Sequence, residues 1–332
     1  MLGKFLTHGL KKIINIDFCD FRANFPKTDN FFYHLLREHY EVRLCDQPDF
    51  LFFGPYGQAH RLHSGIRVLL SIEPDAPNYS SCDYSISCLK LDDLRHFQLP
   101  VYVSYCKNPE RALKSQDDPE RILRSKTKFC SFIVSNYNPR KNGHRVEFFR
   151  ALSRYKRVDS AGCALNNMDA PLPGGSDAKV EFLSPYKFNI AFENRSLRGY
   201  TTEKIFEPML ARCLPIYWGN PLINEEFNPH SFLNRADFLT EQALIDKIIE
   251  LDQDDAKYLE FLRQPYFHHD KPNIYFDRRR LIEFFDRIFT TSIMPVGRRS
   301  LRKWFFLGRW IPIKRNHWHP LAAQATSPPT KK

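Results

Sequence analysis

No stretch of the 332-residue sequence contains 18 consecutive apolar residues, so the sequence predicts no membrane-spanning helix. Residues 1–10 are too short and too interrupted for the apolar part of a signal sequence, and Lys11 and Lys12 follow directly. The eight cysteines form no C-x-x-C pair and several lie within apolar runs, which argues against a zinc site and a disulfide framework. These absences favour a cytoplasmic protein with reduced, buried thiols.

Three ligand-binding motifs are also missing. The sequence has no G-x-G-x-x-G for a dinucleotide and no G-x-x-x-x-G-K-[ST] for a nucleoside triphosphate. A D-x-D that follows a strand often holds a metal and a nucleotide sugar, but the triplet Asp252 to Asp254 lies in a polar helical stretch. His268 and His269 are adjacent and therefore point to different sides. The sequence predicts no metal site and no metal requirement.

Acidic residues are absent from residues 291–332, which contain nine Lys or Arg. The other residues, 1–290, hold 40 basic and 38 acidic side chains, so most of the total charge of +11 lies in this tail. A nearly neutral body argues against a nucleic-acid-binding protein. The tail mixes basic and aromatic residues, as in VGRRSLRKWFF, which suits an anionic membrane surface. Peripheral attachment to the inner membrane face is the prediction, and a solvated tail is the alternative.

The length favours two domains with a ligand cleft between them. In the first third, short apolar runs predict strands at 12–18, 40–45, 50–54, 66–72, 84–88 and 101–105. Helical spacing between the first two runs indicates a strand-helix-strand unit. A parallel sheet covered by helices follows. The polar stretch 107–128 is the predicted domain boundary.

The alternation of strands and helices restarts after this boundary, which predicts a second α/β domain. The expected strands are 129–135, a short one near 157–159, 188–193 and 215–218. Helices are expected at 145–155, 202–213, 241–251, 256–262 and 278–289.

The most informative segment is 186–234, in which a buried strand ends at Glu193 and Asn194 and a helix begins near Thr202. In doubly wound sheets such a turn lies at the ligand crevice. Lys204 is a cation in the first helical turn, where it opposes the helix dipole. A diphosphate at the helix N-terminus would offset this cost, and pairing of Lys204 with Glu203 or Glu193 is the alternative.

Three consecutive motifs, FENRSLRGYTTEKIF, PIYWGNP and FNPHSF, closely resemble the signature of the α-1,3/4-fucosyltransferase family. The segments KRVDSAGCALNN and EFLSPYKFNIAFEN are also similar to that family, so the clear resemblance covers 132–234. It implies a GT-B architecture, in which two Rossmann-like domains face a cleft. The expected limits are 1–125 for an acceptor-binding domain, 126–290 for a GDP-fucose-binding domain and 291–332 for the basic aromatic tail.

The resemblance also implies roles for particular residues. Lys204 and Arg145 would hold the diphosphate of the donor, with Arg145 assigned from the shorter match NPRKNGHRVEFFRALS. Asn194 and Tyr200 would contact the donor. Glu203 would lie near the fucose ring, where it could stabilise oxocarbenium-like charge.

Inverting transfer requires a base for the acceptor hydroxyl, and the resemblance places it at Glu73. This residue directly follows an apolar strand, in SIEPDAPNYSSCDYSIS, and Pro74 would hold it extended at the strand tip. Asp75 is the nearby competitor.

An inverting α-1,3-fucosyltransferase that uses GDP-fucose is therefore expected, with no cofactor. Its acceptor would be an N-acetylglucosamine or glucose hydroxyl in a glycan of the N-acetyllactosamine type, such as a lipopolysaccharide O-chain. Arg195, Leu197 and Arg198 depart from the family pattern, so the rim of the donor pocket or the acceptor preference would differ. The alternatives are a GT-B transferase for another nucleotide sugar and a glycan- or nucleic-acid-binding protein without turnover.

Overall fold

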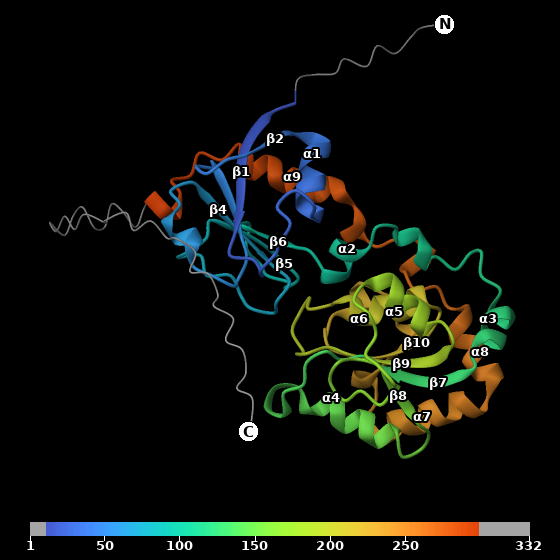
Figure 1. The fold of residues 1–332 in the computed structure, drawn as a ribbon. Coiled ribbons are helices and arrows are strands. Elements are labelled where there is room, and N and C mark those ends of the chain that lie inside the picture. The colour runs from blue at the N-terminus through green and yellow to red at the C-terminus, as the bar shows by residue number, and fades with distance from the viewer. Residues whose placement is uncertain (1–10, 299–332) are drawn as a thin grey trace, which may run out of the picture.

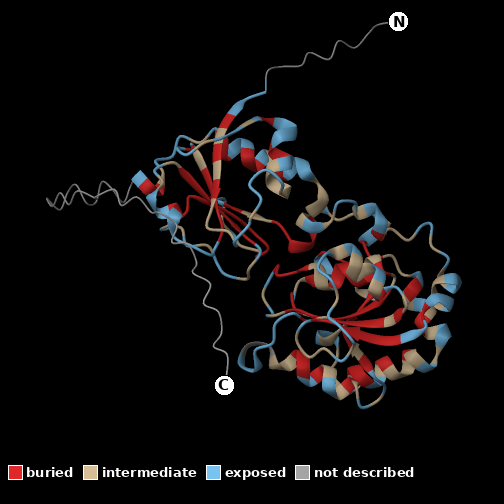
Figure 2. Ribbon diagram, in the orientation of Figure 1, coloured by how far each residue is buried: buried red, intermediate tan, exposed pale blue. Residues whose placement is uncertain are grey.

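The computed structural model describes residues 11–298, apart from the side chains of Lys141 and Asn142. This part of the chain forms two α/β domains, each built on its own parallel sheet (Figure 1). Buried residues concentrate along the strands of both sheets (Figure 2). The predicted α/β class with two Rossmann-like domains is confirmed.

The sheet of the first domain has six parallel strands in the order β2-β1-β3-β4-β5-β6. Its strands are β1 (Ile13–Cys19), β2 (Glu41–Leu44), β3 (Phe50–Phe53), β4 (Ile66–Ser71), β5 (Tyr84–Ser87) and β6 (His96–Gln98). Every residue of β4 and β5 is buried, as expected for central strands covered on both faces. Helix α1 (Phe31–His39) connects β1 to β2 and is capped by Asn30, whose side chain accepts the N–H of Tyr33.

The strand predicted at 101–105 is wrong, because these residues form the short helix α2 (Val101–Tyr105). A short run of mostly apolar residues fits a buried strand and a buried helix equally well. Pro100, with φ of −54°, precedes the first turn, and the N–H of Cys106 closes it on the carbonyl of Tyr102. The edge strand β6 lies just before it, in a polar stretch that gave no strand signal.

The sheet of the second domain has five parallel strands in the order β11-β10-β9-β7-β8. They are β7 (Lys128–Phe132), β8 (Val158–Ser160), β9 (Tyr186–Phe192), β10 (Leu214–Trp218) and β11 (Leu233–Asn234). The helices are α3 (Pro119–Ser125), α4 (Pro139–Leu152), α5 (Ser176–Leu183), α6 (Glu203–Leu210), α7 (Glu241–Gln253) and α8 (Asp255–Arg263). Helices α4 and α7 lie on one side of the sheet, and α5 and α6 lie on the other (Figure 1).

Each sheet reverses its strand order once, between β1 and β3 in the first domain and between β7 and β9 in the second. Ligands of doubly wound folds bind outside the carboxyl ends of the strands at such a point. The fold therefore offers two ligand sites, one in each domain.

Helix α9 (Arg278–Phe289) packs on the first sheet, although the sequence placed it within the second domain at 126–290. Phe285 contacts Phe52 at 5.9 Å between ring centroids, and Phe289 contacts Phe50 at 4.7 Å. The helical pattern was predicted correctly, but such a pattern shows only that a face is apolar and not which sheet covers it. The other predicted domain limits stay predictions, and most of the tail, 299–332, lies outside the described residues.

Within residues 11–298, no helix has the length and apolarity needed to cross a membrane.

Candidate active site

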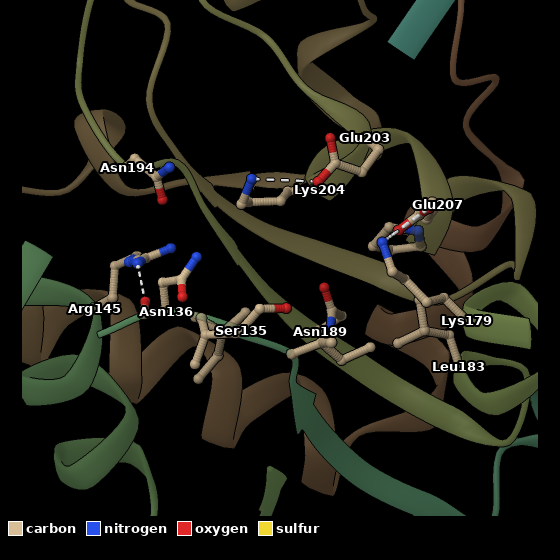
Figure 3. Close-up of a pocket in the computed structure, with 14 residues that line it drawn as sticks. Ser135, Asn136, Arg145, Lys179, Leu183, Asn189, Asn194, Glu203, Lys204 and Glu207 are labelled. Atoms are coloured by element: carbon tan, nitrogen blue, oxygen red, sulfur yellow. Dashed lines mark hydrogen bonds and ion pairs between the residues drawn. The ribbon is translucent and has the colours of Figure 1, made fainter. Parts of the chain in front are cut away.

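A polar cavity of about 200 Å³ lies at the carboxyl ends of β7 and β9, at the reversal point of the second sheet (Figure 3). Its walls come from the segment after β7 and from helices α4, α5 and α6. The polar side chains that line it include Ser135, Asn136, Arg145, Lys179, Asn189, Asn194, Glu203, Lys204 and Glu207. Four of the six predicted site residues, Arg145, Asn194, Glu203 and Lys204, thus meet in one cavity.

Lys204 lies among two carboxylates in the first turn of α6. Its Nζ is 3.4 Å from Glu193 Oε2 and 3.4 Å from Glu203 Oε1, and it donates to Thr202 Oγ1 at 3.0 Å. Burial opposes the charge, but the two carboxylates raise the pKa of Lys204 above its ordinary value. The ion pairs considered as the alternative role of Lys204 are therefore present, and the ammonium also lines the cavity.

Thr202 caps α6 and determines what the helix offers to a ligand. The Thr202 N–H and hydroxyl donate to the two oxygens of fully buried Glu193 at 2.7 and 2.8 Å. Thr202 Oγ1 in turn accepts the N–H of Lys204 at 3.4 Å. Because this backbone donor is already used, the ammonium of Lys204 is the clearest anion-binding group at this helix end.

Arg145 is the second cation of the cavity. It comes from α4, is 3% exposed and donates from one terminal nitrogen to the carbonyl of Asn136 at 3.2 Å. Its Nε is buried and has no hydrogen-bond partner in the described residues. Burial lowers the pKa of this guanidinium. A buried cationic donor without a partner is costly, and an anionic ligand in the cavity would satisfy it.

Lys179 and Glu207, which were not predicted from the sequence, form an ion pair of 3.1 Å at the far end of the cavity. Lys179 belongs to α5, a helix that the sequence did not predict. Glu207 lies one turn after Glu203 on α6, so the i, i+4 spacing in EKIFE was the available signal. Burial raises the pKa of Glu207 to about 7 despite the neighbouring ammonium.

Tyr200, the fifth predicted donor residue, does not line this cavity. It is 3% exposed and packs against Cys88, Leu89 and Val101 of the first domain. The preceding Gly199 has φ of +85°, and a Cβ on it would lie 2.5 Å from the carbonyl oxygen of Cys88. The loop after β9 thus approaches the first domain so closely that only glycine fits at this position.

Glu73, the predicted base, lies in the first domain, two residues after β4. Its Oε1 accepts from the hydroxyl of Tyr56 at 2.6 Å and from Arg22 at 3.1 Å. Both of these hydrogen bonds go to the same oxygen, so the second oxygen, Oε2, is the one available to a substrate.

Asp75, the competitor of Glu73, is 70% exposed at its side chain and pairs with Arg195 of the second domain at 3.5 Å. This pair makes Asp75 an interdomain contact and accounts for one of the three unusual residues in the 195–198 loop. Tyr105 is the last residue of α2. Burial raises its pKa, and the charges of Glu203 and Glu73 add to that effect. Glu73 and the polar cavity therefore lie near the same contact between the domains.

Among residues 11–298, no group of three or more His, Cys, Asp or Glu side chains is arranged to hold a metal ion. Asp252 of the D-x-D triplet accepts from Tyr155 at 3.0 Å and pairs with Lys156 at 3.1 Å. This carboxylate therefore stabilises the α4–α7 side of the second domain, away from the cavity.

Two Rossmann-like domains, with cations at the reversal point of one sheet and a carboxylate at the strand ends of the other, define the GT-B fold class. Two family models match the chain. "Alpha-(1,3)-fucosyltransferase FucT N-terminal domain" matches residues 16–105, and "Glycosyltransferase family 10 (fucosyltransferase) C-term" matches residues 123–272. The chain belongs to the α-1,3/4-fucosyltransferase family.

Among similar curated proteins, the α-(1,3)-fucosyltransferase FucT of Helicobacter pylori is 30% identical over 272 residues, which cover 69% of this chain and 55% of the relative. The human 4-galactosyl-N-acetylglucosaminide 3-α-L-fucosyltransferase FUT6 is 35% identical over 148 residues, 44% of this chain and 39% of the relative. The chain thus spans about half or less of these relatives.

Solved structures share the fold over nearly the whole described chain. A crystal structure of an α1,3-fucosyltransferase has a TM-score of 0.74 and 25% identity, covering 89% of this chain and 94% of the other. A structure of an α1,3-fucosyltransferase with GDP-fucose has a TM-score of 0.71 and 24% identity, covering 89% and 96%. These likenesses confirm the GT-B architecture.

Proposed function

We propose that this chain is an inverting α-1,3-fucosyltransferase that transfers L-fucose from GDP-fucose to a glycan hydroxyl. The observation that carries the proposal is the Arg145 and Lys204 pair at the reversal point of the second sheet, where the buried Nε of Arg145 has no hydrogen-bond partner among residues 11–298. A diphosphate supplies the anionic oxygens that this pair requires. The names of the similar proteins agree with this donor.

In the proposed donor complex, Arg145 and Lys204 bind the diphosphate and Asn194 binds a neutral part of the donor. Tyr200 acts from the domain contact, where it fixes the loop that carries Asn194. The two cations stabilise the negative charge that develops on GDP as the bond to fucose breaks. Glu203 faces the positive charge that develops on the fucose ring.

In the proposed transfer step, Glu73 Oε2 accepts the proton of the acceptor hydroxyl. The hydroxyl oxygen forms a bond to the anomeric carbon of fucose from the face opposite GDP. The bond between that carbon and the diphosphate oxygen breaks, and GDP leaves with the electron pair. One displacement inverts the anomeric carbon and needs no covalent enzyme intermediate.

The finer assignments are part of the same proposal. The names of several relatives, such as FUT6, support a galactosyl-N-acetylglucosaminide acceptor. We place this glycan on a lipopolysaccharide O-chain and the enzyme at the cytoplasmic face of the inner membrane, because residues 291–332 are basic and aromatic. Deletion of residues 299–332 should abolish binding to anionic liposomes in a flotation assay. Unchanged binding would contradict the membrane assignment.

The decisive experiment measures GDP release from GDP-fucose with N-acetyllactosamine, in the presence of EDTA. We expect turnover by the wild type, loss of turnover in Glu73→Ala with GDP affinity retained, and loss of GDP affinity in Lys204→Ala. Matched controls are Asp75→Asn for the base and Lys187→Met for the cation, because Lys187 pairs with Asp255 at 2.8 Å on another part of the domain.

Three outcomes would contradict parts of this proposal. Turnover with another nucleotide sugar but not with GDP-fucose would support a glycosyltransferase and exclude fucose transfer. Full activity of Glu73→Ala would exclude the assigned base. Glycan binding without GDP release by the wild type would indicate a binding protein without turnover.

A further inference from the structure

A second cavity, of about 390 Å³, lies at the carboxyl ends of the first sheet, beside the proposed base. It is larger than the donor cavity and of opposite character, because its surface is mainly carbon. Six aromatic rings line it: Phe21, Phe25, Phe31, Phe32, Tyr56 and Tyr105. Phe21 and Phe25 stack on each other at 4.0 Å between ring centroids. Aliphatic side chains of β4, β5 and α2 complete the wall.

The polar side chains of this wall form hydrogen bonds with other groups of the protein. Asn30 donates to the carbonyl of Pro26 at 2.9 Å and caps α1, and Ser104 donates to the carbonyl of Val101 at 2.8 Å. Ser71 and Ser87 bond to the backbone of Glu73 and Leu89. A ligand group rich in hydroxyls would lose its hydrogen bonds to water here and gain few in return. The cavity is therefore suited to hydrocarbon.

The cavity opens at the reaction site. Arg22 and Tyr56 line it and also hold Oε1 of Glu73, and Ile72 of the wall directly precedes this base. Tyr56, Ile72 and Tyr105 are 44%, 44% and 55% exposed, so apolar groups form much of the mouth, beside the exposed guanidinium of Arg22. An acceptor whose hydroxyl reaches Glu73 would thus have its neighbouring atoms against this mouth.

We propose that this cavity binds a hydrocarbon group, an alkyl chain attached to the acceptor glycan close to the fucosylated sugar. The inference rests on the proposed function for its use in catalysis, since Glu73 fixes where the acceptor hydroxyl lies. The glycan itself stays in the solvated region between the domains, and its alkyl group enters the aromatic cavity. A glycan that carries such an alkyl group then binds more tightly than the same glycan alone, which remains a substrate.

The test compares methyl and octyl glycosides of N-acetyllactosamine, with the octyl compound kept below its micellar concentration. Calorimetric titration measures binding without the donor, and GDP release measures KM. Each fully buried methylene group increases affinity roughly fourfold, so partial burial of the chain should lower Kd and KM for the octyl glycoside by at least about 10-fold. Equal values for the two glycosides would overturn the inference.

Ser104 offers a matched pair of variants, because it lies on α2 at the cavity wall. Ser104→Phe should fill the cavity and reduce the ratio of the methyl and octyl Kd values towards one. Ser104→Ala removes the same hydroxyl without filling space, so it should keep the ratio. An unchanged ratio in Ser104→Phe would show that the alkyl chain binds elsewhere, and circular dichroism checks that both variants are folded.

Failure of this inference is distinguishable from failure of the proposed function. Fucose transfer with equal KM values for the methyl and octyl glycosides would support the proposed function and exclude the alkyl site. An octyl preference in binding without any GDP release would retain the site and exclude the function. If residues 299–332 occupied the cavity, their deletion would itself strengthen octyl binding, and that result would overturn the assignment of the cavity to the acceptor.

Discussion

At the scale of single residues, the proposed donor site concentrates charge that the protein alone does not balance. Glu193 and Glu203 form ion pairs with Lys204, whereas Arg145 donates to the carbonyl of Asn136 and its Nε has no hydrogen-bond partner within the described part of the chain. Removal of water from such a donor costs about 1–3 kcal/mol unless a hydrogen bond replaces it. The unsatisfied donor therefore destabilises the free protein, and bound diphosphate would remove this destabilisation.

This asymmetry predicts opposite effects of Arg145→Met on stability and on binding. The Tm of the free protein should rise, by about 2–4 °C per kcal/mol of relieved cost, while the Kd for GDP should increase roughly 10- to 100-fold. Differential scanning fluorimetry with and without GDP measures both. Arg150→Met, on an exposed position of the same helix, is the control. A lower Tm of free Arg145→Met would show that the guanidinium is structural.

Sequence reasoning reached much of this site because its motif is continuous in the chain. Asn194, Glu203 and Lys204 lie within eleven residues of one strand-helix turn, so a local pattern was sufficient to find them. Lys179 and Glu207 were missed because their pairing spans 28 residues and depends on α5, a helix without a clear apolar stripe. The catalytic roles of all these residues stay predictions.

At the scale of elements, hydrogen bonds to Glu226 stabilise the loop that links β9 to α6. Its Oε1 accepts from Thr201 at 3.0 Å and from Asn220 at 2.9 Å, and Asn220 accepts the N–H of Gly199 at 2.8 Å. Glu226 is fully buried, and burial raises its pKa to about 8. The folded state therefore favours the protonated carboxyl.

The sign of the resulting pH dependence follows from linkage. A raised carboxyl pKa contributes stability that is complete below the ordinary value of 4.5 and is lost as pH rises through about 8. Glu207, at about 7, acts in the same direction at lower pH, whereas burial lowers the pKa of Lys114 to about 7 and that of Lys126 to about 8, and these two groups act in the opposite direction. The difference between wild type and Glu226→Gln therefore isolates Glu226. Between pH 7 and 8.5 the Tm of the wild type should fall relative to that of Glu226→Gln, and thermal melts at closely spaced pH values measure it.

Glu225→Gln is the matched control, since Glu225 is half exposed and pairs with Lys90. It should leave the slope between pH 7 and 8.5 unchanged. Identical slopes in wild type and Glu226→Gln would mean that Glu226 is ionised in the folded state.

Element prediction failed where a short buried segment had two possible structures. Residues 101–105 consist of two valines, two tyrosines and Ser104, a composition that favours a strand, yet they form α2 after Pro100. The N–H of Val101 donates to the carbonyl of Thr201 across the domain contact at 3.0 Å. That tertiary partner is 100 residues away in the chain, so no local pattern could indicate it.

At the scale of the whole molecule, α9 returns the chain from the donor domain to the first sheet. The helix was predicted at its observed bounds, because its apolar stripe is strong, but its location was not. Its buried residues include Leu281, Phe284, Phe285, Ile288 and Phe289. The last described helix thus completes the core of the domain that begins the chain.

This arrangement predicts that a core substitution in α9 lowers the stability of the first domain more than that of the second. Phe285→Ala removes a fully buried ring against Phe52 and should cost about 3–5 kcal/mol, which lowers the melting transition of the first domain. The donor residues Arg145 and Lys204 lie in the other domain, so GDP binding should persist at 20 °C by calorimetry. Arg279→Ala, whose side chain is 85% exposed, is the control. Phe285→Ala could instead abolish GDP binding at a temperature where the second domain is still folded. The proposed donor site would then depend on the packing of α9, and the two domains would have to act as one cooperative unit.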